Sequence, residues 1–555
     1  MATAPLPLHD ILLRRVLRLM LAILMLNGAA ACASLPQGVE RPVSKAFAAP
    51  ATTPLGKLSS TLRARAQAHS DSGFHLLDTV ESALTSRLAL VEGARHTLDL
   101  QYYAMHADAS TELILSKVRD AARRGVRVRI LLDDFNSAGE DAQILRIAFE
   151  PNVEFRLFNP LPGSRGSFVG RILGSLHDVQ RIQQRMHNKL FIADSAWGIT
   201  GGRNLGDAYF GDDESSNFVD LDVLATGRIV RDMAASFDRY WNDELAYPVQ
   251  SLLSPEDLDR LRRRAPQAPK APADAAVLPV VAPGAGTRDH APMDLARVRM
   301  VWAPSILLVD KPEKIAAAEN DPAAGDTVVD GLIGLMRQAR KDVLIVSPYF
   351  VPGAQMMAAF ADLRERGVAV RVLTNSLASN DAPAAHAGYA RYRRDLLRLG
   401  VQLHEMRADP HGAVGLAGSA ADRSGHGAFG LGGSLGSGIG GSKGATSKVS
   451  LHSKAVVIDR SLSVIGSMNL DLRSQLQNSE VALLIRSGTL GGEAARLIES
   501  TLARSAYRVA FDDDGLVWRA PPGASFGDAR SEPEASLRLR LLVRLLGPFA
   551  PDEML

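Results

Sequence analysis

Two short segments of the sequence carry the same polar side chains at the same spacing. Each has a histidine, a lysine two residues later, an aspartate seven residues after the histidine and an asparagine seventeen residues after it. The members are His187, Lys189, Asp194 and Asn204 in the first segment, and His452, Lys454, Asp459 and Asn469 in the second. The offset between the copies is 265 residues throughout, with no gap. Two copies in register indicate a duplicated functional motif, which one copy alone would not.

These residue types suit chemistry on a phosphodiester. Side chains two residues apart on a β-strand project from the same face, so each histidine would lie beside a lysine. If the copies pack about a pseudo-twofold axis, one imidazole can attack phosphorus while the other protonates the leaving oxygen. The lysines, with Asn204 and Asn469, would hold the non-bridging oxygens and stabilise the transition state. Because these side chains match the negative substrate, we expect no metal and no other cofactor.

The carboxylates are expected to have supporting roles. Asp194 and Asp459 belong to the repeated motif, but their odd separation from the histidine points them to the opposite face of a continuing strand. We therefore expect them to anchor the structure rather than to act directly. The imidazole tautomers would be fixed by Asp220 and Glu480, each of which opens another apolar strand farther along the chain.

The elements around the motifs form two similar halves. In each half an apolar strand is followed by a helix, a glycine that ends the helix and a second strand, which is typical of βαβ units in a parallel or mixed sheet. Tyr102, Tyr103 and Tyr349 end such strands, and either packing or contact with a lipid headgroup would explain them. The expected elements are strands at 97–103 and 126–132 around a helix at 112–124, and strands at 343–350 and 368–373 around a helix at 355–366.

The N-terminus has the features of an export signal. Basic residues precede a short apolar run at 19–26, small residues follow, and the chain's single cysteine, Cys32, comes next. This order is typical of a secretory signal, and the position of Cys32 resembles the lipidated cysteine of bacterial lipoproteins. An ordinary signal peptide or an uncleaved anchor remains the alternative. We expect the body of the protein to lie outside the cytoplasm, on the periplasmic side of the cell envelope.

Composition narrows the possible partners. The chain has 555 residues, enough for several domains, and a formal net charge of only +2. A nucleic-acid-binding protein usually shows a concentrated basic excess, so no nucleic acid is expected as a partner. One cysteine excludes an internal disulfide framework.

Residues 265–297 are rich in proline and alanine and are typical of a linker, and residues 409–448 are a glycine- and serine-rich insertion.

The motif pair resembles the phospholipase D superfamily, in the form that has two HKD motifs in one chain. Residues 185–210, 218–227, 237–242 and 461–480 are similar to the bacterial cardiolipin synthase C branch. The resemblance implies an α/β fold of two similar domains, each a mixed β-sheet flanked by helices, packed with pseudo-twofold symmetry around one active site. It also implies a phosphohistidine intermediate without metal, with His187 as nucleophile and His452 as acid. The reverse assignment stays open.

The resemblance sets the expected domain boundaries. The C-terminal extension is predicted to contain an amphipathic helix, with a capping box at Ser531 and Glu534. Its apolar face would consist of Leu537, Leu541, Leu542, Leu545 and Leu546. Such a helix could bind an anionic membrane or simply cover the body. The predicted parts are a signal peptide at 1–32, a tether at 33–55, a first domain at 56–250, a linker at 251–299, a second domain at 300–505 and the extension at 506–555.

The preferred functional hypothesis is a membrane-associated phosphatidyltransferase. Its substrates would be phospholipids, with phosphatidylglycerol and a phospholipid donor giving cardiolipin. Attack by water on the same intermediate would instead make a phospholipase D that releases phosphatidic acid. A nuclease of the same superfamily and an inactive scaffold are further alternatives. The two intact His–Lys pairs argue against the scaffold, and the near-zero net charge argues against the nuclease.

Overall fold

The protein is described here from a computed structural model. The structure describes residues 35–137, 141–163, 171, 175, 178–211, 216–253, 259, 290–316, 327–409, 448–513, 515–547 and 552. The predicted signal segment with Cys32, most of the predicted linker and nearly all of the glycine- and serine-rich insertion lie outside these residues. No helix among the described residues is long and apolar enough to cross a membrane.

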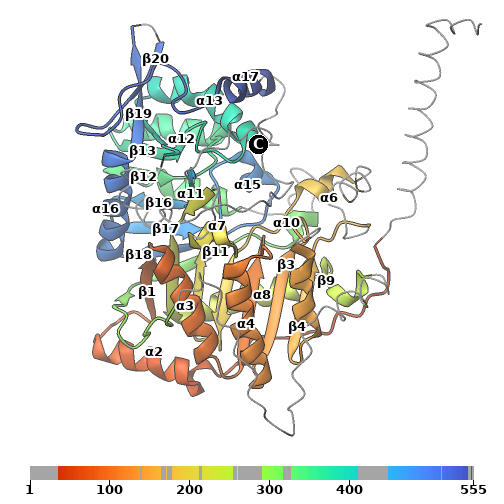
Figure 1. The fold of residues 1–555 in the computed structure, drawn as a ribbon. Helices are drawn as coiled ribbons and strands as arrows, with labels where there is room; N and C mark the ends of the chain where they lie inside the picture. Colours follow the sequence, from red (N-terminus) through yellow and green to blue (C-terminus); the bar gives the residue numbers. More distant parts are fainter. Residues whose placement is uncertain are drawn as a thin grey trace, which may run out of the picture.

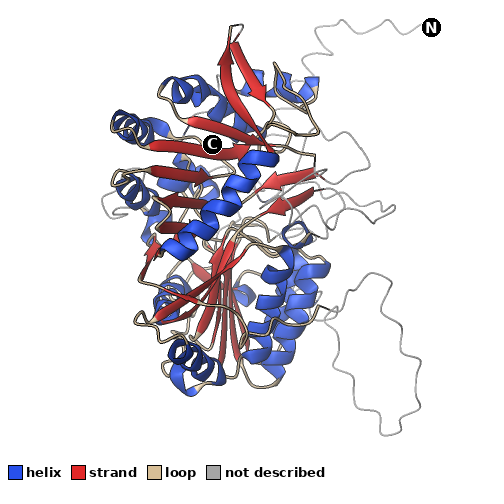
Figure 2. Ribbon diagram, turned by 90° about the vertical axis from the view of Figure 1, so that its left-hand side faces the viewer, coloured by secondary structure: helices blue, strands red, loops and turns tan. Residues whose placement is uncertain are grey.

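Two large mixed sheets form the two halves of the molecule, as predicted (Figures 1 and 2). In each, three neighbouring parallel strands are continued by antiparallel strands on both sides. The first sheet has the order β10 (Val301–Trp302), β1 (Ser72–Leu77), β8 (Asp222–Gly227), β6 (Trp197–Gly201), β5 (Leu190–Ala193), β2 (Thr97–Tyr102), β3 (Arg127–Asp133), β4 (Val153–Phe158) and β9 (Ala246–Pro248).

The second sheet repeats this plan. Its parallel run β12–β13–β14 corresponds to β2–β3–β4 of the first sheet. Its antiparallel run β16–β17–β18 corresponds to β5–β6–β8. Its order is β11 (Ser305–Val309), β18 (Val481–Arg486), β17 (Leu462–Gly466), β16 (Ala455–Ile458), β12 (Asp342–Val346), β13 (Ala369–Asn375), β14 (Gln402–Met406), β19 (Ala506–Asp512) and β20 (Gly515–Arg519).

Helices cover both faces of each sheet (Figure 2). The longer ones are α2 (Pro54–Arg65), α3 (Val80–Gly93), α4 (Ala109–Arg123) and α8 (Arg228–Trp241) in the first half, and α11 (Val328–Met336), α12 (Gly353–Glu365), α13 (Pro383–Arg398), α16 (Gly488–Arg504) and α17 (Leu537–Leu546) in the second. The shorter ones are η1 (Pro50–Thr52), η2 (Asp141–Phe149), α6 (Val179–Gln183), α7 (Asp207–Phe210), η3 (Val249–Ser251), α10 (Glu313–Ala316) and α15 (Leu472–Leu476).

The predicted helix–glycine–strand units are confirmed in both halves. After α4 and α12 the chain turns through Gly125 (φ 94°) and Gly367 (φ 79°), a backbone region that glycine enters without strain. The strand predicted at 343–350 ends earlier, at Val346. Pro348, which has no amide hydrogen to donate, follows closely and prevents the ladder from continuing.

Short segments of the two halves pair with each other, so the halves form one body. Strand β15 (Lys448–Leu451), from the second half, pairs in parallel with β7 (Ser216–Val219), from the first. A parallel bridge joins Met186 of the first half to Ser479 of the second. One apolar core contains residues of both sheets, among them Ile192 and Val457. These contacts place the two motif-bearing segments at the same interface.

The described elements shift some of the expected boundaries. The second sheet continues past residue 505, because β19 pairs with β14 and β20 pairs with β19. Part of the expected tether is fixed to the first half, since the backbone amides of Ser44 and Ala46 donate to Asn242 and Asp238 at 3.0 and 2.8 Å.

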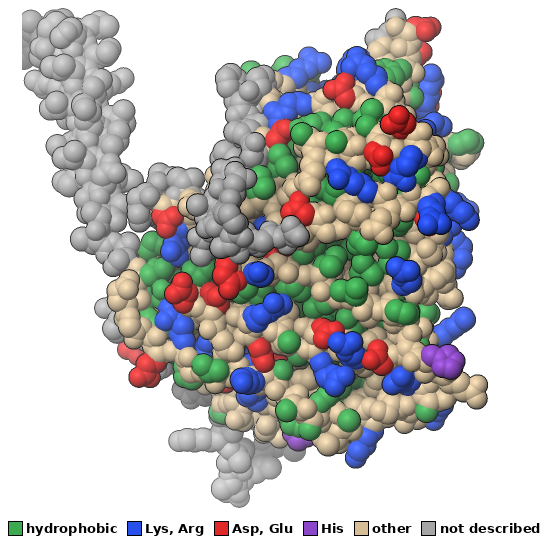
Figure 3. All heavy atoms as spheres, turned by 180° about the vertical axis from the view of Figure 1, so that it is seen from behind, with side chains coloured by type: hydrophobic (Ala, Val, Ile, Leu, Met, Phe, Trp, Pro, Cys, Tyr) green, Lys and Arg blue, Asp and Glu red, His purple; other side chains and the backbone are tan. Residues whose placement is uncertain are grey.

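On the face shown in Figure 3, acidic and basic side chains are intermingled, in keeping with the small net charge.

The predicted capping box of the C-terminal helix is wrong. Helix α17 begins at Leu537, and its cap is Ser536, whose side chain accepts from the amide of Leu539. Glu534 has a left-handed backbone (φ 57°), and its carboxylate binds the Arg407 side chain and the Ala408 amide. Because Glu534 is held by these contacts, the helix starts after it.

Candidate active site

The two His–Lys pairs lie just before the first strand of a hairpin. The hairpins are β5–β6 and β16–β17, and their strands begin one residue after Lys189 and Lys454. The pairs therefore lie on the extended approach to the strand rather than within it. Lys189 turns back to donate to the carbonyl of His187 at 2.8 Å, and Lys454 does the same to His452 at 2.5 Å.

The motif aspartates lie at the far ends of these hairpins. Asp194 accepts from the backbone amides of residues 95–97 at 2.7 to 3.2 Å, and Asp459 accepts from those of residues 340–342 at 2.7 to 3.2 Å. Both aspartates have a left-handed backbone, as the tight turns require. These contacts agree with the predicted anchoring role, and they hold each hairpin against the strand beside it.

Each imidazole is bound by a carboxylate from the opposite half. His187 Nδ1 lies 3.1 and 3.0 Å from the two oxygens of Glu480, and His452 Nδ1 lies 2.8 Å from Asp220 Oδ2. A carboxylate accepts hydrogen bonds only, so Nδ1 carries the proton in both rings and Nε2 keeps its lone pair. Both orienting carboxylates were predicted from the sequence, whereas their crosswise pairing was not.

Backbone hydrogen bonds explain the crosswise pairing. The amide of His187 donates to the carbonyl of Ser479 at 2.9 Å, and the amide of His452 donates to the carbonyl of Val219 at 2.8 Å. In each case the acceptor immediately precedes the orienting carboxylate in the sequence. The segments exchanged between the halves thus place each histidine next to the carboxylate that binds it.

Both imidazoles are close to buried, with 8% of His187 and 6% of His452 exposed. Burial lowers the pKa of His187 to about 4, the lysines Lys189 and Lys454 lower it too, and Glu480 opposes them. Burial and the same two lysines lower the pKa of His452 to about 3, against the effect of its own carboxylate. Each histidine is therefore neutral at pH 7, and each is influenced by the lysine of the other motif.

The lysines titrate near neutrality. Burial lowers the pKa of Lys189 to about 7 and that of Lys454 to about 8, although Glu480 and Asp220 raise both. A bound phosphodiester would add a negative charge among the buried cations. That charge raises the pKa of every lysine and imidazole around it, because opposite charge favours the protonated form. On their own, the two lysines thus hold their positive charge weakly, and an anionic substrate would strengthen it.

The two carboxylates are held ionised by their partners. Burial opposes ionisation of Glu480, but His187, Lys189 and the hydroxyl of Ser467 outweigh it and lower its pKa. Burial likewise opposes ionisation of Asp220, and the hydrogen bond from His452 and the nearby cations outweigh it. Both groups therefore offer a negative charge to the imidazole proton.

The two halves differ behind these carboxylates. Ser467 Oγ donates to Glu480 at 2.5 Å, and Ser474 Oγ donates to the other oxygen at 2.9 Å. In the first half Gly202 stands at the position of Ser467. A Cβ on Gly202 would lie 2.3 Å from Asp220 Oδ1, so the shorter carboxylate needs a glycine beside it. The longer glutamate leaves room for a serine.

The two asparagines differ in their surroundings. Asn204 Nδ2 donates to the hydroxyl of Tyr209 at 2.9 Å, and its Oδ1 accepts from the Ala104 amide at 3.3 Å. Asn469 Oδ1 is buried without a hydrogen-bond partner among the described residues, while its backbone amide donates to Ser474. Asn469 therefore keeps a polar atom available beside the site.

Aromatic side chains border each imidazole. The rings of Tyr103 and His187 lie 5.0 Å apart, and those of Tyr209 and His452 lie 5.2 Å apart, both in edge-on contact. Tyr349 donates to the exposed carboxylate of Asp381 at 2.8 Å. Tyr102, by contrast, is a buried packing residue that accepts from Arg87.

Two of these residues were not found by sequence reasoning. Tyr209 follows Asn204 by five residues, and Asp381 lies in a loop without a motif. The only sequence signal for Tyr209 is its closeness to the repeated segment. Nothing in the sequence near Asp381 points to the site.

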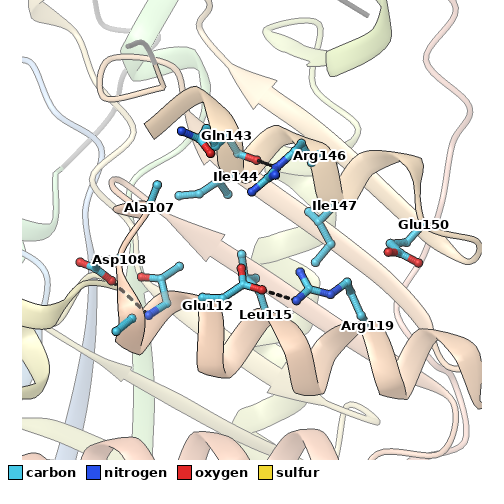
Figure 4. Close-up of a pocket in the computed structure, with 12 residues that line it drawn as sticks. Ala107, Asp108, Glu112, Leu115, Arg119, Gln143, Ile144, Arg146, Ile147 and Glu150 are labelled. Carbon is cyan, nitrogen blue, oxygen red and sulfur yellow. Dashed lines mark hydrogen bonds and ion pairs between the residues drawn. The ribbon is translucent and has the colours of Figure 1, made fainter. Parts of the chain in front are cut away.

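A separate pocket of about 380 Å³ lies between α4 and η2 on the first half (Figure 4). It is lined by side chains such as Glu112, which binds Arg119, and Ile144, and none of its lining residues belongs to the two motifs. Among the described residues, no three His, Cys, Asp or Glu side chains are grouped as ligands of a metal ion.

Comparisons with known proteins agree with this geometry. The sequence matches the family described as "Cardiolipin synthase, PLD-like domain" over residues 88–241, 332–420 and 439–503. It is 35% identical over 494 residues to cardiolipin synthase C of Escherichia coli (strain K12), covering 85% of this chain and 94% of that protein. Cardiolipin synthase A of Yersinia pseudotuberculosis serotype O:3 (strain YPIII) is 22% identical over 449 residues, covering 80% of this chain and 71% of that protein.

A solved structure supports the fold. The crystal structure of phosphatidylserine synthase from Haemophilus influenzae Rd KW20 matches with a TM-score of 0.51 at 14% identity, covering 81% of this chain and 92% of that one. This chain and that enzyme therefore share their fold. The chain belongs to the cardiolipin synthase family of phospholipase-D-like proteins and is a phosphatidyltransferase of that type.

Proposed function

We propose that this protein makes cardiolipin by transferring a phosphatidyl group from a phospholipid donor to phosphatidylglycerol. The observation that carries the proposal is the pair of neutral imidazoles, each with Nδ1 bound to a carboxylate and Nε2 free to react. The name of the 35% identical relative, cardiolipin synthase C of Escherichia coli, agrees with this product.

In the first step, Nε2 of His187 attacks the phosphorus of the donor. A phosphorus–nitrogen bond forms, the bond to the headgroup oxygen breaks, and His452 gives its proton to that oxygen. The bound phosphodiester raises the pKa of His452, so Nε2 of this imidazole takes up a proton from solvent as the donor binds, and this is the proton that it gives to the leaving oxygen. Glu480 stabilises the positive charge that develops on His187, and Lys189 and Lys454 stabilise the non-bridging oxygens.

In the second step, a hydroxyl of phosphatidylglycerol attacks the phosphohistidine. His452 now takes the hydroxyl proton, the new phosphorus–oxygen bond forms and the bond to His187 breaks. The site returns to its starting state, with both imidazoles as they began. We assign the nucleophile to His187 by analogy with the family, and the near-symmetry of the site makes the reverse order the alternative to be tested.

The phospholipid substrates imply action at a membrane. We propose an exported protein on the periplasmic side of the envelope, with Cys32 lipidated after removal of the signal segment. The order of basic, apolar and small residues before Cys32 supports this proposal. Radioactive palmitate incorporated by the wild type and not by Cys32→Ser would support it, and equal labelling of both would contradict it.

The product assay tests the function directly. Purified protein is incubated with labelled phosphatidylglycerol, with and without phosphatidylethanolamine, and the lipids are separated by chromatography. Labelled cardiolipin supports the transferase, and phosphatidic acid alone would show a phospholipase D. Neither product, together with digestion of DNA, would overturn the lipid function.

A further inference from the structure

The C-terminal helix α17 has an inner and an outer apolar face. On the inner face, Leu539 and Val543 pack on a small buried cluster that includes Leu377 and Ala378. The helix also lies against α13 at the end of the second half (Figure 1). The sequence left open whether this helix binds a membrane or covers the body. Packing on the body accounts for its inner face only, so the outer face needs a separate explanation.

The outer face is a row of exposed leucines. Leu537, Leu541 and Leu545, spaced one turn apart, are 71%, 49% and 68% exposed. Large apolar side chains in a contiguous exposed row usually mark an interaction surface. Arg538 and Arg544 are also exposed on this helix, and within the described part of the chain neither forms an ion pair. The outer face thus combines three leucines with two uncompensated positive charges.

The loop beneath this helix also borders the active site. Leu377 and Ala378 lie shortly after β13. Asp381 of the same loop accepts a hydrogen bond from the hydroxyl of Tyr349. At the end of β13, Asn375 exchanges two hydrogen bonds with the backbone of Leu451, the residue before His452. The helix that carries the leucine row therefore packs on a loop whose neighbouring residues contact the segment of His452.

We propose that Leu537, Leu541 and Leu545, with Arg538 and Arg544, form a docking surface for an anionic phospholipid bilayer. This deepens the proposed function and rests on it, because it names the surface that would bring the site to its lipid substrates. The leucines would enter the boundary between headgroups and acyl chains, while the guanidiniums bind lipid phosphates.

The size of the row favours a membrane over a second copy of the chain. A stable protein interface buries about 800 Å² on each partner, far more than three leucines on one short helix offer. A bilayer needs only a narrow apolar row flanked by cations, since it adapts to the helix and supplies the opposite charge.

A fluorescent probe on the row tests the proposal without relying on turnover. Cys32 is the only cysteine, so the full-length Cys32→Ser, Leu541→Cys protein takes a single environment-sensitive label. The matched control is Cys32→Ser, Ile306→Cys, because Ile306 is also strongly exposed (59%) but lies on β11. Each protein is mixed with vesicles of phosphatidylcholine alone or with phosphatidylglycerol added, including spin-labelled lipid as a quencher.

We expect a blue shift and quenching at position 541 with phosphatidylglycerol vesicles, a smaller effect with neutral vesicles and none at position 306. A probe at 541 that stays in water with both kinds of vesicle would overturn the proposal. A probe already shielded in the absence of lipid would overturn it too, because another part of the chain or a second copy would then cover the row.

A second set of variants connects the surface to activity. The triple change Leu537→Ser, Leu541→Ser, Leu545→Ser should reduce turnover of vesicle substrate by about tenfold or more and leave turnover of detergent-dispersed substrate unchanged. Ile306→Ser should leave both unchanged. Equal turnover by triple variant and wild type on vesicles would contradict the proposal. A protein that binds vesicles through the row yet forms no cardiolipin would instead refute the proposed function alone.

Discussion

Replacing Glu480 by glutamine tests whether its charge assists the reaction. Both oxygens of Glu480 face His187 Nδ1, and each also accepts from a serine hydroxyl, Ser467 or Ser474. Glutamine has the same size, and the serine hydroxyls can rotate to accept from its amide group. The substitution therefore removes the negative charge and keeps the packing.

The expected loss follows from the hydrogen bond to the imidazole. A charge-assisted hydrogen bond contributes about 1.5–3 kcal/mol, and a neutral one about 1 kcal/mol. The difference of about 0.5–2 kcal/mol corresponds to a decrease in kcat of about 2- to 30-fold. The pH profile should change as well, because Glu480 raises the pKa of both Lys189 and Lys454. Without it these lysines lose their protons at lower pH, so the alkaline limb moves to lower pH.

The assay is cardiolipin formation from detergent-dispersed phosphatidylglycerol between pH 5 and pH 9, with Glu499→Gln as the control. Glu499 is also a glutamate with a lowered pKa, owing to its surface arginines Arg460 and Arg371, and it lies outside the site. The control should match the wild type at every pH. A Glu480→Gln enzyme with wild-type kcat and an unmoved alkaline limb would refute the electrostatic role assigned to this carboxylate.

Three further perturbations test the anchoring role of Asp194, the space beside Asp220 and the independence of the reaction from metal. Asp194→Asn should lower the unfolding free energy by about 2 kcal/mol, measured by urea denaturation, because the backbone amides of residues 95–97 lose the carboxylate that accepts from them. Its kcat per folded molecule should be unchanged, and a large loss of kcat would show a direct role. Gly202→Ser should abolish turnover, since its side chain would overlap Asp220, and an active, folded variant would show that this carboxylate can move freely. EDTA should leave turnover unchanged, and activity lost in EDTA and restored by zinc would refute the mechanism without metal.

The repeated motif predicted which side chains lie together. The constant offset indicated two matching segments, and the structure brings their histidines and lysines to one interface, although each pair lies just before its strand and not on it. The odd spacing of Asp194 and Asp459 predicted their separation from the imidazoles, which their contacts with backbone amides agree with. Local spacing determines these features, so the sequence is sufficient to find them.

The crosswise pairing could not be found in this way. It depends on the exchange of β7 and β15 and on the bridge at Met186, which are contacts between segments hundreds of residues apart. The same limit explains why Asp381 was missed, because tertiary packing alone brings its loop to Tyr349. The helix start at Leu537 was mispredicted for a related reason, since Glu534 binds Arg407 instead of capping the helix.

In the proposed mechanism His187 carries the phosphatidyl group, while His452 transfers protons. A phosphatidyl donor with a nitrophenol leaving group, which departs without help from an acid, separates these two roles. His452→Ala should release one nitrophenol per site and then stop, and mass spectrometry should find the phosphatidyl group on His187. His187→Ala should give neither burst nor adduct. An adduct on His452 in the His187→Ala protein, or steady turnover without any adduct, would contradict the account.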